Sequence, residues 1–390
     1  MEILFLVHRV PFPPDRGDKI RSFHVLKHLA SRARVHLVAF ADDPRDLDPP
    51  AAFRALVDEC VIVPRAKPQW RAGIEALATR RALSLTAFDD VAVRGAVTDI
   101  LSRRPIDAIY AFSGQMAQYL PAAGPRAIMD FVDADSAKFA AFAGETAGFM
   151  RWMFAREARL LGAYERQVTA RVDASLFVSA AEAALVPGGT ALENGIDLDF
   201  FNPAAVFPAV IESAPLAVFT GQMDYRPNVQ AVTFFAREVM PRLRMTHPRL
   251  RFAIVGRAPT EEVRALANDA VMVTGEVADV RGWLATASVV VAPLMLARGI
   301  QNKVLEAMAM ARPVVASSAA AEGIDHAGMI RVADGVGDTA EAVAALLDSP
   351  GEADRLGLMA RAQVRRRYAW DACLAPLDAL LGFDARKAAA

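Results

Sequence analysis

The sequence has few cysteines and almost no net charge. Only Cys60 and Cys373 occur in 390 residues. Two thiols so far apart cannot form the disulfide framework of a small secreted domain, so we expect a reducing, cytoplasmic environment. The 44 Lys and Arg residues are balanced by 45 Asp and Glu residues, which leaves a net charge of −1. Because no overall positive field recruits nucleic acid, we expect no nucleic-acid partner.

Long hydrophobic runs are also missing. The most continuous run, 287–297, contains a proline and falls short of the ~18–20 apolar residues that a membrane-spanning helix needs. The first apolar run, near the N-terminus, is too short for a secretion signal and follows an acidic second residue. We therefore expect a cytoplasmic protein that is at most peripheral on the inner face of a membrane.

Several catalytic motifs are absent. The turn after the first apolar run lacks the G-x-G-x-x-G of a dinucleotide fold, which argues against a dehydrogenase. Neither H-E-x-x-H, paired C-x-x-C nor G-x-S-x-G occurs, so zinc and serine hydrolases have no support. His24 and His28 have a metal-ligand spacing, but no third ligand follows a known pattern, and we interpret both as structural. We expect no metal and no cofactor.

What the sequence does contain is a regular alternation of short β-branched runs and amphipathic helical patterns. Runs such as EILFLV, DAIYAF, RFAIVG and SVVVAPL are apolar on both faces, as in a parallel sheet that helices cover on both sides. A proline-rich interruption at 203–215 separates two such series. The pattern predicts an α/β protein with two doubly wound, Rossmann-like domains, 1–205 and 214–368, and a C-terminal helix and tail, 369–390.

The most informative stretch is RGIQNKVLEAM, which begins at residue 298 and follows a predicted strand. Asn302 is placed to cap a helix, and Lys303 and Glu306 share one side of it. The loop amides and the helix dipole favour an anion, Lys303 adds a positive charge, and Glu306 accepts hydrogen bonds from hydroxyls. A phosphate next to a polyol fits this arrangement, which indicates a nucleotide sugar. The alternative is a solvated Lys–Glu pair.

Other candidates also follow predicted strands, where ligands of open α/β sheets bind. Gly221 ends a strand, and the guanidinium of Arg226 in the next loop suits a diphosphate, unless it is a surface arginine. In the first half, Gly17 and Asp18 precede a helix, and a glycine there allows a ligand to approach the main chain. Asp133 follows another strand. We interpret it as an acceptor-side residue rather than a metal ligand. The alternative is that this stretch only starts the following helix, with Asp135 or Ser136 as its cap.

A basic segment lies at 65–83. It combines five cations with Trp70, Leu77 and Leu83. Basic residues beside a tryptophan suit an anionic membrane surface. We therefore expect weak peripheral membrane contact through this segment, and a solvated basic helix is the alternative.

Together these stretches resemble family 4 of the retaining glycosyltransferases. The segment from RGIQNKVLEAM to PVVAS is similar to the donor-binding segment of that family, and ENGIDLDFFNP is similar to its domain-closing motif. GQMDYRPN and PFPPDRGDKIR narrow the resemblance to sugar transferases of PEP-CTERM (exosortase) exopolysaccharide systems. The resemblance implies the GT-B architecture, two Rossmann-like domains facing across a cleft. It also implies retaining, metal-independent transfer from a nucleotide-diphosphate sugar to an exopolysaccharide acceptor, which we expect to be lipid-linked.

The resemblance also implies residue roles. Glu306 matches the family's second glutamate, which holds the ribose hydroxyls, while Lys303 and Arg226 fall where cations meet the diphosphate. Gly17 matches the N-terminal glycine loop near the phosphates and the transferred sugar. We therefore predict a donor site formed by Gly17, Asp18, Gly221, Arg298, Gly299, Ile300, Gln301, Asn302 and Glu306. The catalytic candidates are Lys303, Arg226 and Asp133.

Two departures from the family keep other functions open. Arg298 stands where the family has its first glutamate, and the usual acceptor-side histidine has no match, so Asp133 takes its place as a candidate. One alternative is a nucleotide-sugar 2-epimerase on the same architecture, which would turn over the donor without an acceptor. The other is a catalytically inactive subunit that binds a sugar nucleotide.

Overall fold

The computed structural model describes residues 1–297 and 300–383. Contacts divide the chain into two compact units, which we describe separately. Unit 1 comprises residues 1–194 and the chain from Cys373 onward, and unit 2 comprises residues 195–372. This division differs from the predicted domain ends at 205 and 368, because the C-terminal helix packs on unit 1. There Asp378 lies 2.9 Å from Nε2 of His28.

The sheet of unit 1 is parallel throughout its described residues. Its strand order is β3-β2-β1-β4-β5-β6-β7. Strands β1 and β4 and the middle of β5 are buried, which explains their continuous apolar sequences. The strands are β1 Glu2–Val7, β2 Arg34–Ala41, β3 Glu59–Pro64, β4 Ala108–Phe112, β5 Arg126–Val132, β6 Ala174–Phe177 and β7 Gly189–Ala191.

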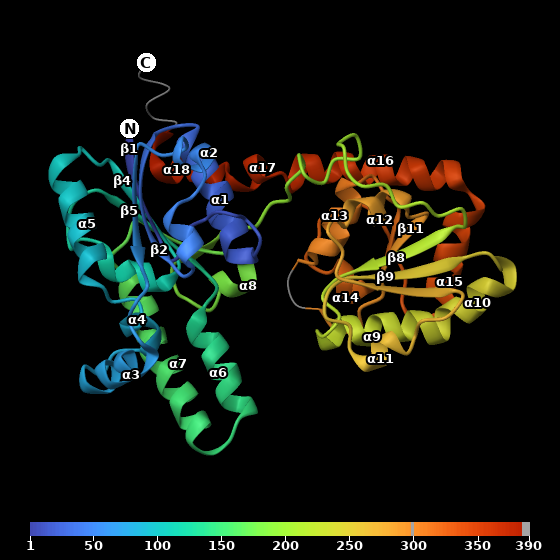
Figure 1. The fold of residues 1–390 in the computed structure, drawn as a ribbon, viewed down its shortest axis with the longest axis horizontal. Coiled ribbons are helices and arrows are strands. Elements are labelled where there is room, and N and C mark those ends of the chain that lie inside the picture. Colours follow the sequence, from blue (N-terminus) through green and yellow to red (C-terminus); the bar gives the residue numbers. More distant parts are fainter. Residues whose placement is uncertain (298–299, 384–390) are drawn as a thin grey trace. The chain divides into compact units, whose positions relative to one another are not determined.

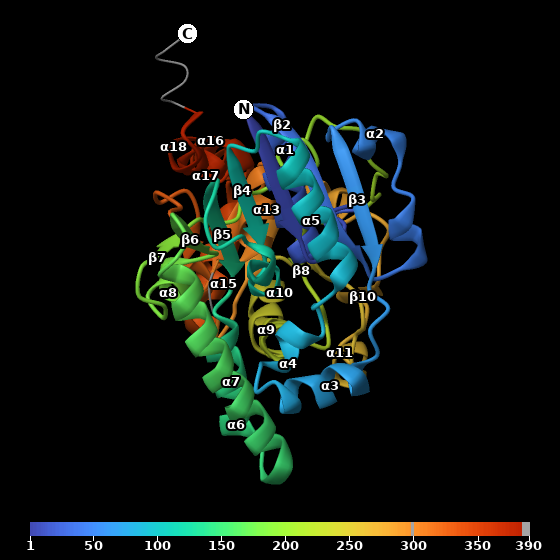
Figure 2. The ribbon, with the colours of Figure 1, turned by 90° about the vertical axis from the view of Figure 1, so that its left-hand side faces the viewer.

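Helices cover both faces of this sheet (Figure 1). The apolar side of α5 packs on alternate residues of β1, β4 and β5, while α1 lies over the other face. Helices α6 and α7 form an antiparallel pair that projects from the sheet (Figures 1 and 2). The helices are α1 Gly17–Ala30, η1 Pro44–Leu47, α2 Ala51–Arg54, α3 Gln69–Ala78, α4 Leu83–Thr86, α5 Val91–Arg103, η2 Gly114–Tyr119, α6 Asp135–Glu145, α7 Gly148–Thr169, α8 Ala180–Ala183, α17 Trp370–Leu374 and α18 Pro376–Leu381.

Unit 2 repeats the construction with a second parallel sheet. Its strand order is β10-β9-β8-β11-β12-β13. The strands are β8 Leu216–Thr220, β9 Arg251–Val255, β10 Val271–Gly275, β11 Val289–Ala292, β12 Val314–Ala316 and β13 Arg331–Val332. The helices are α9 Arg226–Phe234, α10 Met240–Thr246, α11 Glu261–Arg264, α12 Arg281–Thr286, α13 Asn302–Ala309, α14 Ser318–Ala321, α15 Gly335–Asp348 and α16 Pro350–Arg367.

The predicted fold class is confirmed, with two departures in detail. The helical pattern after β8 is interrupted by a π-helical turn, η3 Phe235–Val239. Pro241 follows that turn and has no N–H to donate to the carbonyl four residues earlier. The regular hydrogen-bond ladder therefore cannot continue through it. Strands β7 and β13 are three and two residues long, too short for a recognisable apolar run. None of the described helices is both long and apolar enough to span a membrane.

A buried ion pair joins α1 to the sheet of unit 1. Arg21 and Asp130 are 1% and 0% exposed. The guanidinium donates from Nε to one carboxylate oxygen at 3.0 Å and from Nη2 to the other at 3.2 Å. The hydroxyl of Tyr110 on β4 donates to the same carboxylate at 2.7 Å, and Arg21 Nη1 donates to Oδ1 of Asn194 at 2.8 Å. This network fixes α1 against β4, β5 and the last residue before unit 2.

We predict that Asp130→Ala destabilises the protein by about 3–5 kcal/mol, because it leaves the Arg21 guanidinium buried without its counter-ion. Urea unfolding followed by circular dichroism measures the effect. Asp99→Ala is the matched control, since Asp99 pairs with Arg103 on the exposed surface of α5. Equal unfolding midpoints for the two variants would contradict the prediction.

Candidate functional site

A cavity of about 480 Å³ opens at the carboxyl end of the sheet in unit 2. Strands β8 and β11 lie side by side there, and their connections lead to opposite halves of the sheet. This is the topological switch point, where open α/β sheets bind their ligands. The lining residues come from the loops after β8, β9 and β10 and from the start of α13: Thr220, Gly221, Gln222, Tyr225, Asn228, Val255, Gly256, Arg257, Glu276, Val277, Val280, Ile300, Gln301, Asn302, Lys303 and Glu306.

Two glycines allow the main chain of these loops to pack closely. A Cβ atom on Gly256 would lie 1.6 Å from the carbonyl oxygen of Gly221. A Cβ on Gly221 would lie 2.8 Å from Nδ2 of Asn228 and 3.3 Å from Nζ of Lys303. Side chains at either position would therefore push the β8 and β9 loops apart or displace the polar groups of the cavity.

Lys303 is held at the cavity wall by neutral groups. Its ammonium donates to Oδ1 of Asn228 and lies 4.3 Å from the ring centroid of Phe219. Asn228 in turn donates from Nδ2 to the carbonyl of Gln222 at 2.8 Å. Among the described residues, no carboxylate lies within ion-pair distance of Lys303. Burial lowers the pKa of Lys303 to about 8, although the nearby Glu306 opposes the shift.

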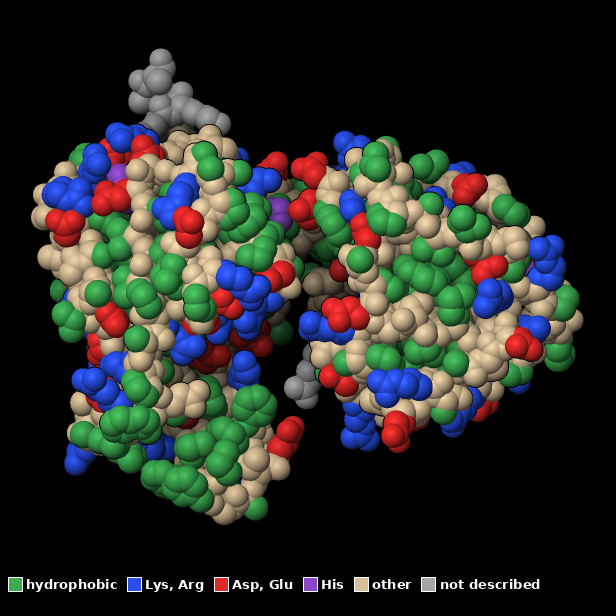
Figure 3. Space-filling model, viewed as in Figure 1, with side chains coloured by type: hydrophobic (Ala, Val, Ile, Leu, Met, Phe, Trp, Pro, Cys, Tyr) green, Lys and Arg blue, Asp and Glu red, His purple; other side chains and the backbone are tan. Residues whose placement is uncertain are grey.

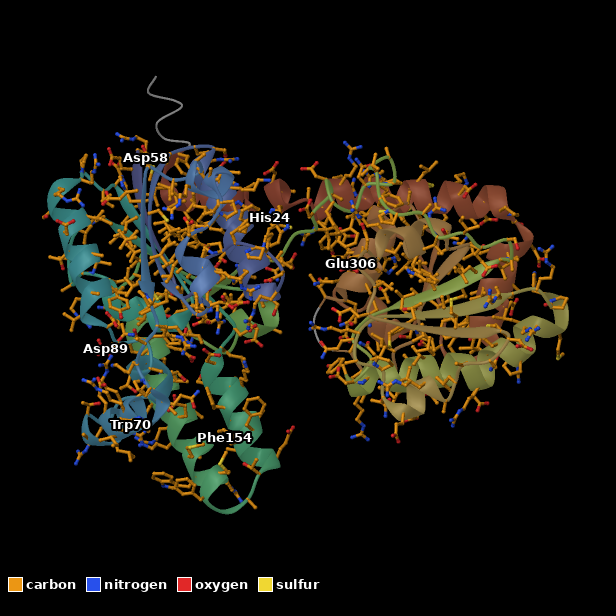
Figure 4. The ribbon with its side chains drawn as sticks, in the orientation of Figure 1. His24, Asp58, Trp70, Asp89, Phe154 and Glu306 are labelled. Atoms are coloured by element: carbon orange, nitrogen blue, oxygen red, sulfur yellow. The ribbon has the colours of Figure 1, made fainter. Side chains whose placement is uncertain are left out.

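Glu306 lies one turn further along α13 (Figure 4). Burial raises the pKa of its carboxyl group to about 7, partly offset by Lys303. Within the described part of the chain, its carboxylate accepts no hydrogen bond. The ammonium of Lys303 and the carboxylate of Glu306 have therefore lost water without gaining an oppositely charged partner within ion-pair distance. This raises the free energy of both charged forms. A ligand that offers an anion to Lys303 and hydroxyls to Glu306 would supply both partners.

The start of α13 differs from the predicted cap. Gln301 is the N-cap residue, and Asn302 is the first helical residue, so Asn302 does not cap the helix. Ile300, Gln301 and Asn302 all line the cavity. Arg298 and Gly299 lie outside the described residues.

The arginine in the cavity lining is Arg257, not Arg226. Arg226 is exposed, begins α9 and is outside the lining. Arg257 follows β9, and its Nη2 donates to Oε1 of Gln222 at 3.0 Å. Neither Arg257 nor Glu276, which follows β10, is among the site residues predicted from the sequence. Arg257 and Glu276 both follow predicted strands. The rule that ligands bind at the carboxyl ends of strands could therefore have identified them.

The unit 1 candidates lie in a different environment. Gly17 begins α1, and nothing lies within 4 Å of where its Cβ would be. Asp18 accepts from Arg9 at 2.6 Å and lies 3.2 Å from Nε2 of His8. Although burial disfavours this carboxylate, those hydrogen bonds hold the pKa of Asp18 well below its usual range. The charge of Asp18 is therefore already satisfied by protein groups.

Asp133 is exposed directly after β5. Although part of the residue is exposed, partial desolvation of its carboxyl group and the neighbouring Glu182 raise the pKa of Asp133. The structure shows no hydrogen bond between Asp133 and Asp18 within the described chain. The structure brings together Gly221, Lys303, Glu306 and residues 300–302 in one cavity of unit 2.

Comparison with known proteins adds an independent finding. Residues 214–349 match the sequence model of the family described as glycosyl transferases group 1. No curated protein matches the sequence significantly. Similar solved structures include sucrose-phosphate synthase from Thermosynechococcus elongatus, with a TM-score of 0.63 and 16% identity over 100% of both chains. HepE from Anabaena in complex with UDP has a TM-score of 0.62 and 14% identity over 98% of this chain and 100% of that one. WaaG, a glycosyltransferase involved in lipopolysaccharide biosynthesis, has a TM-score of 0.62 and 17% identity over 97% and 99%.

The two Rossmann-like units have the GT-B fold of these structures. The family match falls on unit 2 and includes every described residue that lines the cavity. The protein is accordingly a glycosyltransferase with the GT-B fold. The narrower likeness to family 4 and to exopolysaccharide systems stays a prediction.

We predict that Glu306→Gln stabilises the protein at pH 8 by about 1–3 kcal/mol. The pKa of Glu306 in the folded protein, about 7, exceeds its ordinary value of 4.5. The folded protein is therefore more stable at acid pH, where the carboxyl group of Glu306 is protonated. It loses this stability as the pH rises through about 7. The neutral amide avoids that loss, so the difference should shrink as the pH falls toward 4.5.

Urea unfolding at several pH values measures this difference, and Glu238→Gln, on the exposed surface of unit 2, is the control. If Glu306→Gln were equally or less stable than wild type at pH 8, the ionised carboxylate would have a partner that the geometry does not include.

Proposed function

We propose that the protein transfers a sugar from a nucleoside-diphosphate donor, bound in the cavity of unit 2, to an exopolysaccharide acceptor that is lipid-linked. The observation that carries this proposal is that an ammonium and a carboxylate, Lys303 and Glu306, line one switch-point cavity without an ion-pair partner among the described residues. A diphosphate next to a ribose has the complementary groups. HepE, which has a similar fold, is described as complexed with UDP and with UDP-glucose, which supports a nucleotide-sugar donor.

Catalysis in this proposal depends on stabilising the departing diphosphate. Negative charge grows on the phosphate oxygens as the bond to the sugar breaks. Lys303 and the start of α13 both line the cavity, and the positive charge of the one and the helix dipole of the other favour this growing negative charge. Binding of the diphosphate also raises the pKa of Lys303, which keeps its ammonium charged through the reaction. Glu306 holds ribose hydroxyls, whose charge changes little.

The chain supplies positive charge without a metal ion in this mechanism. Lys303 and Arg257 both line the cavity, and Arg257 is placed for a second contact with the diphosphate. Transfer is proposed to proceed with retention, as the resemblance to family 4 implies. Asp133, exposed at the carboxyl end of its sheet, remains the proposed acceptor-side residue.

Peripheral membrane contact through residues 65–83 belongs to the same proposal, because a lipid-linked acceptor is presented at a bilayer. Trp70 is 69% exposed on α3, and Arg71 and Arg80 are exposed beside it. WaaG, which also has a similar fold, is described as acting in lipopolysaccharide biosynthesis, which supports a surface-glycan role.

Substitutions of Lys303 and of Glu306 should have different effects, the first on kcat and the second on donor binding. Lys303→Ala should lower kcat by roughly 10²–10³, the usual effect of losing a group that stabilises transition-state charge. Glu306→Gln should mainly weaken donor binding, by about 1.5–3 kcal/mol, because hydrogen bonds to a charged group are lost. Steady-state kinetics and donor calorimetry on both variants measure these effects.

Controls for these variants come from the same unit. Glu238→Gln should leave kcat and donor affinity unchanged, and Arg257→Ala should weaken donor binding more than Arg226→Ala does. Kinetics and affinity close to wild type for both Lys303→Ala and Glu306→Gln would refute the proposed donor site. Turnover of the donor without any acceptor would identify the 2-epimerase instead, and tight donor binding without turnover would identify the inactive subunit.

We predict that transfer survives excess EDTA. The cations expected to meet the diphosphate are side chains of this protein, so chelation removes nothing that the reaction needs. The transfer rate is measured with EDTA and again after manganese is added in excess. Complete loss of transfer that manganese restores would overturn the metal-independent mechanism and leave the donor site itself standing.

A further inference from the structure

The hairpin of α6 and α7 is a rigid element whose exposed end has no role in the sugar-nucleotide site. Its two helices pack closely along their length and project from the body of unit 1 (Figures 1 and 2). Phe139, Phe142 and Phe154 fill the space between the helices with ring centroids 5.7–6.1 Å apart. The hairpin therefore has an aromatic interior of its own.

Two buried carboxylates stabilise the hairpin: Glu157 joins it to α4, and Glu165 joins its two helices to each other. Glu157 accepts hydrogen bonds from the amides of Leu83 and Ser84 at 2.8 and 2.7 Å, and Glu165 accepts from the amide of Ser136 at 2.9 Å. Both glutamates are at most 5% exposed. Charge-assisted hydrogen bonds of this kind hold the hairpin in one orientation, so its end is presented by a stiff support.

The end of the hairpin exposes large apolar side chains. Phe149 is 71% exposed and Trp152 is 53% exposed, and their rings stack on each other with centroids 5.7 Å apart. Met150 between them is 43% exposed. Because the interior of the hairpin is already filled, these side chains contribute nothing to its packing. Contiguous apolar surface of this kind marks an interaction site.

Helix α3 adds a second apolar stripe at the same end of unit 1. Trp70, Ile74 and Leu77 are 61–69% exposed at helical spacing. Figures 1 and 2 both show α3 and the hairpin at this end, and Figure 3 shows hydrophobic side chains gathered over it. Figure 4 labels Trp70 on α3 and Phe154 within the hairpin.

Unpaired cations surround these apolar side chains. Arg71 and Arg80 flank the stripe of α3, and Arg151 and Arg159 lie on α7. All four are exposed, and none forms an ion pair within the part of the chain that the structure describes. A second copy of the chain docked through the same surface would bring these like charges together across a two-fold axis. An anionic lipid surface, by contrast, complements them.

We propose that Phe149, Met150 and Trp152, at the end of the α6–α7 hairpin, insert into the boundary between headgroups and acyl chains of an anionic membrane. Tryptophan and phenylalanine suit this boundary, because the acyl chains on one side are apolar and the headgroups on the other side are hydrated. The arginines of α7 and α3 stay at the level of the phosphates. This extends the membrane contact proposed for 65–83 from an electrostatic attachment to an inserted wedge. It does not depend on donor binding in unit 2.

Vesicles of phosphatidylcholine and phosphatidylglycerol in equal parts are the probe, and sedimentation measures binding by the full chain. Phe149→Ser combined with Trp152→Ser should weaken binding by roughly tenfold for each side chain, because each loses its burial in lipid. The matched control combines Leu47→Ser and Leu185→Ser, two exposed apolar residues of unit 1 outside α3, α6 and α7, and should bind as wild type does.

Salt separates the two contributions to binding. High salt should weaken the contact made by the arginines of α3 and spare the apolar contact of the hairpin. In a Trp70→Phe variant, lipids brominated in their acyl chains should still quench tryptophan fluorescence, and adding Trp152→Phe should abolish most of that quenching.

Three outcomes would overturn the proposal. One is unchanged vesicle binding by the Phe149→Ser, Trp152→Ser variant, and another is the absence of quenching that depends on Trp152. The third is a shift from dimer to monomer for that variant in sedimentation velocity without lipid, which would make the hairpin an interface between copies. UDP calorimetry on the same variants should match wild type in every case, so a failure here is distinct from a failure of the donor site.

Discussion

The cost of holding charge away from water shapes the cavity of unit 2. Lys303 and Glu306 share α13, yet the helix sets them apart, so that neither neutralises the other by direct contact. Asn228 and Phe219 hold the ammonium with a neutral oxygen and a ring face, which orient it without cancelling its charge. The result is a lysine with a lowered pKa and a glutamate with a raised pKa at the edge of one cavity. These two pKa shifts reflect the free-energy cost of burying each charge, which a ligand with complementary groups can offset.

The two units treat similar positions in opposite ways. In each, polar residues stand at the start of a helix, α1 or α13, at the carboxyl end of a parallel sheet. In unit 1, Asp18 is neutralised by Arg9 and hydrogen-bonded to His8, so its charge is already satisfied. A ligand gains little from a charge that the protein has satisfied, because it must first break the existing contact. The unsatisfied charges of unit 2 make it the stronger site for an anion.

Much of this was predictable because the governing patterns are local. Strands buried on both faces carry apolar runs, so all the predicted strands are present, and the polar first turn of α13 pointed to the cavity. The contacts that complete the site join distant residues. Lys303 meets Asn228 across 75 positions, which no local pattern specifies. Arg226 and Arg257 have the same chemistry after adjacent strands, and only the path of each loop decides which of them lines the cavity.

The same reasoning explains why the hairpin escaped prediction. Helices α6 and α7 have an apolar side that packs inward, and from sequence alone Phe149 and Trp152 would belong to it. Their exposure follows from the length of α7, whose 22 residues extend beyond the body of unit 1. Buried glutamates fix the base of this helix, and the rings at its far end stack on each other. Burying those rings within unit 1 would require the base to give up its charge-assisted hydrogen bonds. The rings of Phe149 and Trp152 are therefore removed from water by contact with a surface outside the protein.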